Sequence, residues 1–271
     1  MMARLLSSAS PIALVLTIAA AFPAAAADLT PAAPQSLPVA PVATADTPVF
    51  YATGYLWASA LHGTTGTLPP LPPAEVNLSF GDILKNFDGG LMAAAEMRTG
   101  RWSFLGDVMF SQVSPDGNLP GPYRTGVELR SRSLTLQANA LYRVYDGPAV
   151  DFDVGAGLRY WNLDNRVNVN ASPVLPGIGY SENEAWVDPL VVGRIIARLG
   201  GPWSLTVVGD VGGFDVGSTL TWQMIGTVNY QWSEQLALRA GYRYLSVDYR
   251  AGDFLYNVQM QGPILGATYR F

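Results

Sequence analysis

The residue best suited to acid–base chemistry is a single histidine, in a chain that has no cysteine. His62 could serve a hydrolase only beside paired carboxylates or a serine nucleophile. Ser59 lies three residues before it, and Asp82, Asp88 and Asp215 are acids that could approach it. None of these spacings is diagnostic of an active site. A lone histidine at the end of a strand is more often a solvated polar residue, so we expect no enzyme, and a hydrolase using His62 is the least favoured alternative.

Charged residues suggest a second kind of chemistry, because acids and arginines recur at alternate positions opposite apolar residues. The guanidinium group of arginine is planar and can bind a carboxylate through two parallel hydrogen bonds. A lone charge in a narrow, poorly hydrated space would be costly, so we predict arginine–carboxylate networks. The residues expected to form them are Glu96, Arg98, Asp107, Arg143, Asp151, Asp153, Arg159, Asp188, Arg194, Arg198, Asp210, Arg239 and Arg243.

The same alternation defines the elements that carry these side chains. Between Val150 and Trp161, apolar residues alternate with charged, small or aromatic ones, as in a strand that has one oily and one polar face. The patterns are long enough to cross a bilayer as tilted strands, whereas no apolar stretch after residue 27 is long enough for a membrane helix. Ten strands are expected near 49–61, 87–99, 102–114, 127–145, 149–163, 185–199, 202–215, 218–232, 236–250 and 254–271.

The connections between these strands alternate between very short turns and mostly longer loops. This is typical of an antiparallel, up-and-down transmembrane β-barrel with tight periplasmic turns and longer outer loops. The longer connections are expected at 62–86, 115–126 and 164–184. Both chain ends should lie in the periplasm, which requires an even number of strands. We therefore predict about ten strands, with eight as the alternative and the first strand as the weakest assignment.

The amino terminus resembles a secretory signal. Arg4 precedes an apolar run from Pro11 to Ala21, and three alanines then offer a cleavage site before Asp28. We expect three segments: a signal peptide over 1–27, a Pro- and Ala-rich periplasmic lead over 28–48 and the barrel over 49–271.

Composition narrows the partners. Charged residues are only 14% of the 271, against about 25% in an average soluble domain, so much of the surface should face something other than water. The formal net charge is -5, and the sequence has no basic stripe that could neutralise phosphates, so nucleic acid is not an expected partner. We expect no cofactor and no metal. The Asp116-Gly117-Asn118 run could bind calcium, but these residue types are more typical of a turn.

Two further groups point to the outer membrane. Tyr269 and Phe271 end an alternating apolar row, which is expected to be the signal for the barrel-assembly machinery. Arg124, Arg130 and Arg132 lie where lipopolysaccharide phosphates would be, and they are equally typical of solvated loop charge.

Several motifs resemble a family of uncharacterised proteobacterial outer-membrane β-barrels, over roughly residues 50–271. The resemblance implies a small monomeric barrel near the size of the OmpA transmembrane domain, with no assigned activity. We expect no peptidoglycan-binding domain after residue 271, in which the sequence departs from full-length OmpA-type proteins. The motifs are Ser79–Leu84, Gly157–Leu163, Trp186–Leu190, Gly209–Phe214 and Gly241–Leu245.

The sequence therefore predicts an outer-membrane barrel with a structural, envelope or surface role, its lumen filled by arginine–carboxylate pairs. A small passive channel for ions or polar solutes is the alternative, because a barrel of eight to ten strands is just wide enough to be filled by side chains or to pass a small solute.

Overall fold

The computed structural model describes residues 47–68, 72–114, 116–118, 126–171 and 177–271. The predicted signal peptide, nearly all of the predicted lead and Arg124 lie outside this part of the chain. Within it, the strands are β1 (Val49–Trp57), β2 (Ala60–Gly66), β3 (Ala74–Leu78), β4 (Phe87–Thr99), β5 (Trp102–Val113), β6 (Asp116–Asn118), β7 (Gly126–Asp146), β8 (Val150–Val169), β9 (Ile178–Gly200), β10 (Trp203–Gly213), β11 (Leu220–Gln231), β12 (Leu236–Ala251) and β13 (Phe254–Arg270).

Ten antiparallel strands close into a barrel, which confirms the predicted fold class and strand number. The order is β1-β4-β5-β7-β8-β9-β10-β11-β12-β13, and β13 closes the ring by pairing with β1. β2 continues the line of β1 along β13, because Trp57 faces Ile264 and Ala60 faces Gln261 in one uninterrupted register. The short strand β3 pairs along most of β2, and β6 pairs with the first residues of β7.

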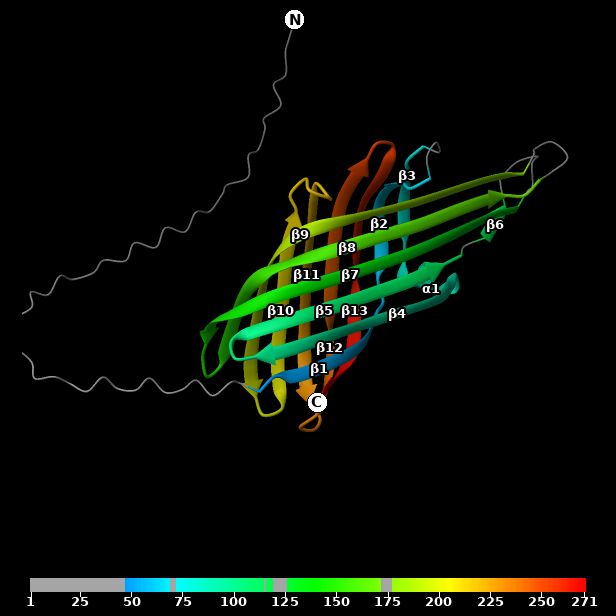
Figure 1. The fold of residues 1–271 in the computed structure, drawn as a ribbon. Helices are drawn as coiled ribbons and strands as arrows, with labels where there is room; N and C mark the ends of the chain where they lie inside the picture. The colour runs from blue at the N-terminus through cyan, green and yellow to red at the C-terminus, as the bar shows by residue number, and fades with distance from the viewer. Residues whose placement is uncertain (1–46, 69–71, 115, 119–125, 172–176) are drawn as a thin grey trace, which may run out of the picture. The chain divides into compact units, whose positions relative to one another are not determined.

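The two ends of the barrel differ in their connections. Phe271 and four short turns lie at one end, called the lower end here. The other, upper end carries the longer connections and also the two-residue turn between β12 and β13 (Figure 1). β7, β8 and β9 extend farthest beyond the rest of the barrel (Figure 1). β10 pairs with β9 only as far as Gly212 opposite Leu190, so the turn between β10 and β11 comes well before the upper end of β9. This arrangement matches barrels that keep short turns in the periplasm and long loops outside.

The predicted loop over 164–184 is wrong over most of its length. β8 continues to Val169 and β9 begins at Ile178, so both strands rise well above their expected ends. The predicted loop over 62–86 likewise contains the upper part of β2, strand β3 and a short helix, α1 (Phe80–Lys85). The serine at position 79 caps α1 by accepting a hydrogen bond from the Asp82 amide. Among the described residues, no helix is both long and apolar enough to span a membrane.

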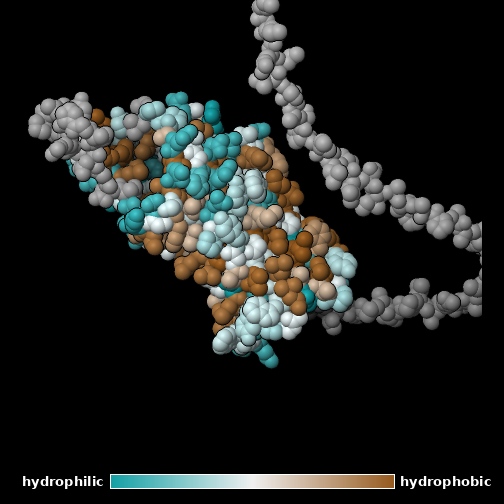
Figure 2. All heavy atoms as spheres, turned by 180° about the vertical axis from the view of Figure 1, so that it is seen from behind, coloured by the Kyte–Doolittle hydropathy of each residue, from teal (hydrophilic) through white to brown (hydrophobic). Residues whose placement is uncertain are grey.

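An apolar belt surrounds the lower part of the barrel, with aromatic residues at both of its edges. Trp203 packs on Tyr230 at the lower edge, and Trp222 stacks on Tyr244 at the upper edge. Trp222 and Tyr230 lie eight residues apart on β11. Eight residues of strand rise about 26 Å, which a tilt of about 40° reduces to about 20 Å, close to the apolar band of outer-membrane barrels. Figure 2 shows hydrophobic residues gathered over the lower part of one face and hydrophilic ones above them.

Candidate functional site: the packed lumen

Three groups of inward side chains occupy the lumen, one above another. The lower network consists of charged residues near the lower end. The middle layer is a network of polar side chains that hydrogen-bond to one another across the lumen. The aromatic cluster fills the upper part. Each is held by strand alternation, which sends every second residue inward.

The lower network joins opposite walls of the barrel. Arg194 on β9 contacts Glu96 on β4 at 2.7 Å and Asp153 on β8 at 2.6 Å. Arg98 also binds Glu96, with its Nε 2.6 Å from the carboxylate. Because Glu96 and Arg194 come from strands that do not neighbour each other, their contact crosses the lumen.

Two further arginines complete the lower network around the acids of β8. Arg143 contacts Asp153 at 2.9 Å and Asp151 at 3.3 Å, and Arg198 contacts Asp151 at 2.7 Å. The side chain of Asp151 is only 3% exposed, whereas that of Arg198 is 48% exposed at the rim. The network therefore passes from solvent at the lower rim into the interior.

The middle layer is centred on an ion pair that is completely shielded from solvent. Arg159 on β8 donates to Asp210 on β10 at 2.8 Å, and both side chains are 0% exposed. Gln137 on β7 and Gln223 on β11 donate to the same carboxylate at 3.1 Å and 2.9 Å. Arg159 also donates to Gln137 and to Thr221, so its charge is held by three strands.

The same layer continues to the other side of the barrel through a second arginine. Arg243 on β12 donates to Gln223 at 2.8 Å and to the Tyr55 hydroxyl at 3.0 Å. Tyr55 on β1 in turn donates to Asp107 on β5 at 2.7 Å. One chain of hydrogen bonds thus links β1, β5, β7, β8, β10, β11 and β12 at a single level, and buried networks of this kind are rigid when every member is paired.

The aromatic cluster lies above this layer. Trp186 stacks on Tyr249 with ring centroids 3.8 Å apart, and on Trp161 at 5.6 Å. Leu245 and Val247 of β12 are both 0% exposed in the same cluster. Large aromatic side chains that pack face to face and edge to face leave little room between them.

Asp188 connects the aromatic cluster to the turn between β10 and β11. It accepts hydrogen bonds from the Trp161 indole at 2.9 Å and from the Ser218 amide at 2.6 Å. The Trp186 indole donates to the Ser218 hydroxyl, and Ser218 is 0% exposed. Ser218 therefore anchors the turn between β10 and β11 to the mouth of the barrel, whereas Phe214 and Val216 at the tip of the turn are exposed.

The structure brings together most of the residues that the sequence singled out, but not all of them. Arg239 points inward and makes no ion pair among the described residues, and its Nε is buried without a hydrogen-bond partner. Asp188 is bonded to neutral donors and not to an arginine. Sequence reasoning did not single out Tyr55, Gln137 and Gln223, although the position of the two glutamines on the polar face was a usable signal.

The lipopolysaccharide candidates that the structure describes lie on the outer surface. Arg130 and Arg132 point outward just above the apolar belt, with Arg166 opposite Arg130 and Asp164 opposite Arg132 on β8. Arg132 donates to Gln112 of β5 at 2.9 Å. Three arginines thus lie on one patch of the outer wall.

His62 lies on β2, opposite Gln259 on one side and Asn77 on the other. Two of the three acids considered as its partners are engaged elsewhere: Asp82 binds Ser79 and Lys85, and Asp88 accepts from Ser114 and Gln112. The third, Asp215, lies in the turn between β10 and β11. Hydrogen bonds from Ser79 lower the pKa of the Asp82 carboxyl. Nothing in the described part of the chain assembles a catalytic group around His62.

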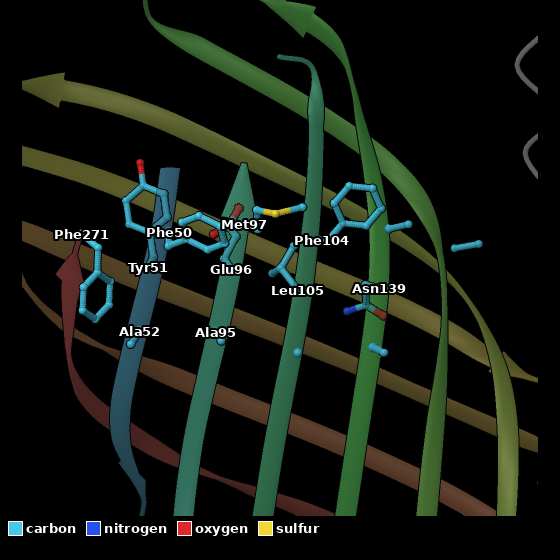
Figure 3. Close-up of a pocket in the computed structure, with 14 residues that line it drawn as sticks. Phe50, Tyr51, Ala52, Ala95, Glu96, Met97, Phe104, Leu105, Asn139 and Phe271 are labelled. Carbon is cyan, nitrogen blue, oxygen red and sulfur yellow. The ribbon is translucent and has the colours of Figure 1, made fainter. Parts of the chain in front are cut away.

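A groove of about 740 Å³ lies low on the barrel wall (Figure 3). Its lining includes small outward residues such as Ala52 and Ala95, between Phe50, Phe104 and Phe271. Most of its lining side chains lie on the outward parity of their strands, so it belongs to the lipid-facing surface and not to the lumen.

The comparisons with known proteins give distant likenesses only. No family model and no curated protein matches the sequence. The solved structures it is similar to include the translocator domain of the autotransporter NalP from Neisseria meningitidis, with 12% identity, 85% of this chain and 91% of that chain covered and a TM-score of 0.46. The transport unit of the autotransporter AIDA-I from Escherichia coli has 8% identity, 87% and 94% coverage and a TM-score of 0.39. Ail, the attachment invasion locus protein of Yersinia pestis, has 11% identity, 83% and 99% coverage and a TM-score of 0.34.

The geometry of the barrel itself defines the class of protein. A closed antiparallel ring of ten strands with an apolar outer belt and aromatic girdles is the architecture of outer-membrane proteins, because closure removes the two open edges that a sheet would otherwise present to lipid along its whole length. The protein is a β-barrel of the bacterial outer membrane.

Proposed function

We propose that the protein is a sealed envelope barrel: it spans the outer membrane, conducts no solutes and presents its tall outer wall at the cell surface. The single observation that carries this proposal is the middle layer. A continuous hydrogen-bonded network with a fully buried ion pair crosses the lumen, and the aromatic cluster lies directly above it.

Single-channel conductance of the mature protein in a planar bilayer tests the proposal. We expect the unmodified barrel to show no steps, and the double variant Arg159→Ala/Asp210→Ala to show small ones, because it removes the ion pair without leaving a lone buried charge. The matched control is Asp164→Ala/Arg166→Ala, which removes an ion pair from the outer face of β8. Heat-modifiable migration on a gel verifies that each variant is folded.

The alternative functions give different results in the same experiments. Steady, salt-dependent steps from the unmodified protein that change with Arg194→Ala would overturn the sealed barrel in favour of a passive channel. A hydrolytic activity that is lost in His62→Ala would instead support a barrel enzyme.

The outer wall is also the proposed site of lipopolysaccharide contact, supported by the outward position of Arg130 and Arg132 above the belt. Arginine binds phosphate oxygens through paired hydrogen bonds. Lipopolysaccharide should therefore raise the unfolding temperature of the protein more than it raises that of Arg130→Gln/Arg132→Gln. Equal shifts would identify these residues as solvated surface charge.

A further inference from the structure

The ring of strands has a seam on one side. The ladder between β1 and β4 runs from Val49 opposite Arg98 only as far as Gly54 opposite Ala93. Above this point the first strand continues as β2, which pairs with β3, whereas the upper part of β4 (87–92) pairs with β5 alone. Within the described strands, the outer edges of β3 and of upper β4 therefore have no strand partner.

The seam begins inside the apolar belt, where the surrounding solvent is lipid. Leu56 and Leu91 are the outward residues on its two sides, and they are 76% and 59% exposed. Leu91 lies opposite Phe110, which lies opposite Leu134, so all three belong to the upper part of the belt. Helix α1 connects β3 to β4 beside the seam and adds the exposed Leu84. The molecules next to this opening in the ladder are thus acyl chains of the outer leaflet.

Behind the seam lies the lower edge of the aromatic cluster. Tyr55, Trp57 and Met109 are buried there, and Met92 and Ala94 of β4 pack against them. Apart from the Tyr55 hydroxyl and the Trp57 indole nitrogen, these side chains are apolar, and no ladder pairs β1 with β4 at this level. Separating upper β4 from β1 therefore breaks no ladder hydrogen bonds, in contrast to every paired part of the wall.

Two buried polar atoms at this position lack hydrogen-bond partners. The Trp57 indole nitrogen is a donor with no acceptor, although the residue is only 6% exposed. The Oδ1 of Asp107 is an acceptor with no donor at hydrogen-bond distance, its nearest cation being Arg243 at 3.6 Å. Arg243 also lies over the Trp57 ring, 4.9 Å from its centroid, so both atoms flank the same guanidinium group. Buried unsatisfied groups in native proteins call for a partner.

We propose that the seam is a lateral portal that binds a long-chain fatty acid from the outer leaflet. The hydrocarbon chain lies between Leu56 and Leu91, and the carboxyl group, in its protonated form, accepts a hydrogen bond from the Trp57 indole and donates one to Asp107. A protonated carboxyl group offers one donor and one acceptor, which are the two functions that the site lacks. The middle layer closes the site from below, so the ligand enters and leaves through the membrane.

Photo-crosslinking of the folded protein in lipid vesicles tests this proposal. The probe is a long-chain fatty acid with a diazirine close to its carboxyl group, and mass spectrometry maps the labelled residues. We expect label on the inward residues Met92 and Met109 as well as on the outward belt. Label confined to outward residues would overturn the portal.

Two comparisons identify the ligand group and its source. Trp57→Phe should lower labelling of Met109 by about fivefold relative to belt labelling, the effect of one hydrogen bond. The matched control, Trp203→Phe in the lower girdle, should leave that ratio unchanged. A phospholipid carrying the same diazirine chain should label the belt only, and inward labelling by the phospholipid would overturn the assignment to a fatty acid. Because the readout is independent of conductance, a conducting barrel could still possess the portal, and a sealed one could lack it.

Discussion

The lower and upper parts of β8 place opposite kinds of side chain on their two faces. In the lower part, Val154 and Leu158 point outward to lipid, and Asp153 and Arg159 point inward. Above Tyr160 the pattern reverses, so that polar residues such as Asn162 point outward and apolar ones such as Leu163 are buried. The strand keeps its alternation throughout, but the solvent outside it changes from lipid to water.

This comparison explains why the lumen contains two different cores. Where the outer face must be apolar to contact lipid, the inner face carries the polar residues, which must then satisfy one another through ion pairs and hydrogen bonds. Where the outer face meets water, the inner face can be an ordinary hydrophobic core. The first kind of core depends on matched partners, whereas the second depends on volume and contact. The predictions below test this difference.

The largest effect is expected from removing one member of the buried ion pair. Arg159→Met leaves the Asp210 carboxylate without its cation and should lower the free energy of unfolding by about 3–5 kcal/mol. Replacing both residues, as in Arg159→Met/Asp210→Leu, should restore most of this loss. Urea unfolding in lipid vesicles, followed by tryptophan fluorescence, measures both. Similar losses of unfolding free energy in the single and double variants would contradict the claim that the polar part of the lumen depends on paired charges.

The aromatic cluster should respond to lost volume instead. Leu245→Ala removes a fully buried side chain and should cost about 2–4 kcal/mol by the same measurement, because a cavity remains. No second substitution should restore this loss unless it refills the space, as Val258→Leu on the neighbouring strand β13 would in part. If truncating a neighbouring side chain restored the full free energy of unfolding, the aromatic cluster could not be packed as described.

The outer face of β8 offers a direct contrast between lipid and water. Val154→Arg places a charge near the middle of the apolar belt and should cost about 2–4 kcal/mol. Asn162→Arg makes the same addition to the same face above the belt and should change stability by less than about 0.5 kcal/mol. Equal losses of stability at the two positions would contradict the claim that position 154 faces lipid and position 162 faces water.

A smaller effect of opposite sign is expected at Arg239. Its side chain is half-buried and makes no ion pair among the described residues, and its Nε is buried without a hydrogen-bond partner. Replacing this half-buried charge, which has no close carboxylate partner, with an apolar side chain of similar length, Arg239→Met, should raise the free energy of unfolding by about 1 kcal/mol. Destabilisation would show that Arg239 has a partner that its contacts do not reveal.

Much of the barrel could be predicted from the sequence, because lipid imposes a strict alternation on the strands that it surrounds. The bounds of β4, β5 and β12 agree with the expected ranges to within about a residue or two. The upper parts of β8 and β9 were predicted as loop because their outward residues are polar. The reversal of faces above Tyr160 was the signal that was missed.

The lumen was less predictable in its details than in its residue types. Alternation assigns a residue to the inner face but does not say which residue of another strand it meets. That depends on the stagger between strands, which brings Arg159 to Asp210 and leaves Arg239 without an ion pair among the described residues. The seam beside β4 was also hidden, because it arises from where the β1–β4 ladder stops and not from any residue type.

The most direct test of the two-part account is the accessibility of spin labels along the outer face of β8. The chain has no cysteine, so Val154→Cys, Leu158→Cys, Asn162→Cys and Arg166→Cys can each be labelled alone. In lipid vesicles, the account predicts that labels at 154 and 158 collide more with oxygen than with a water-soluble nickel chelate, and that labels at 162 and 166 show the reverse. A label at 166 that is as lipid-exposed as one at 158, or one at 154 that is open to the chelate, would contradict it.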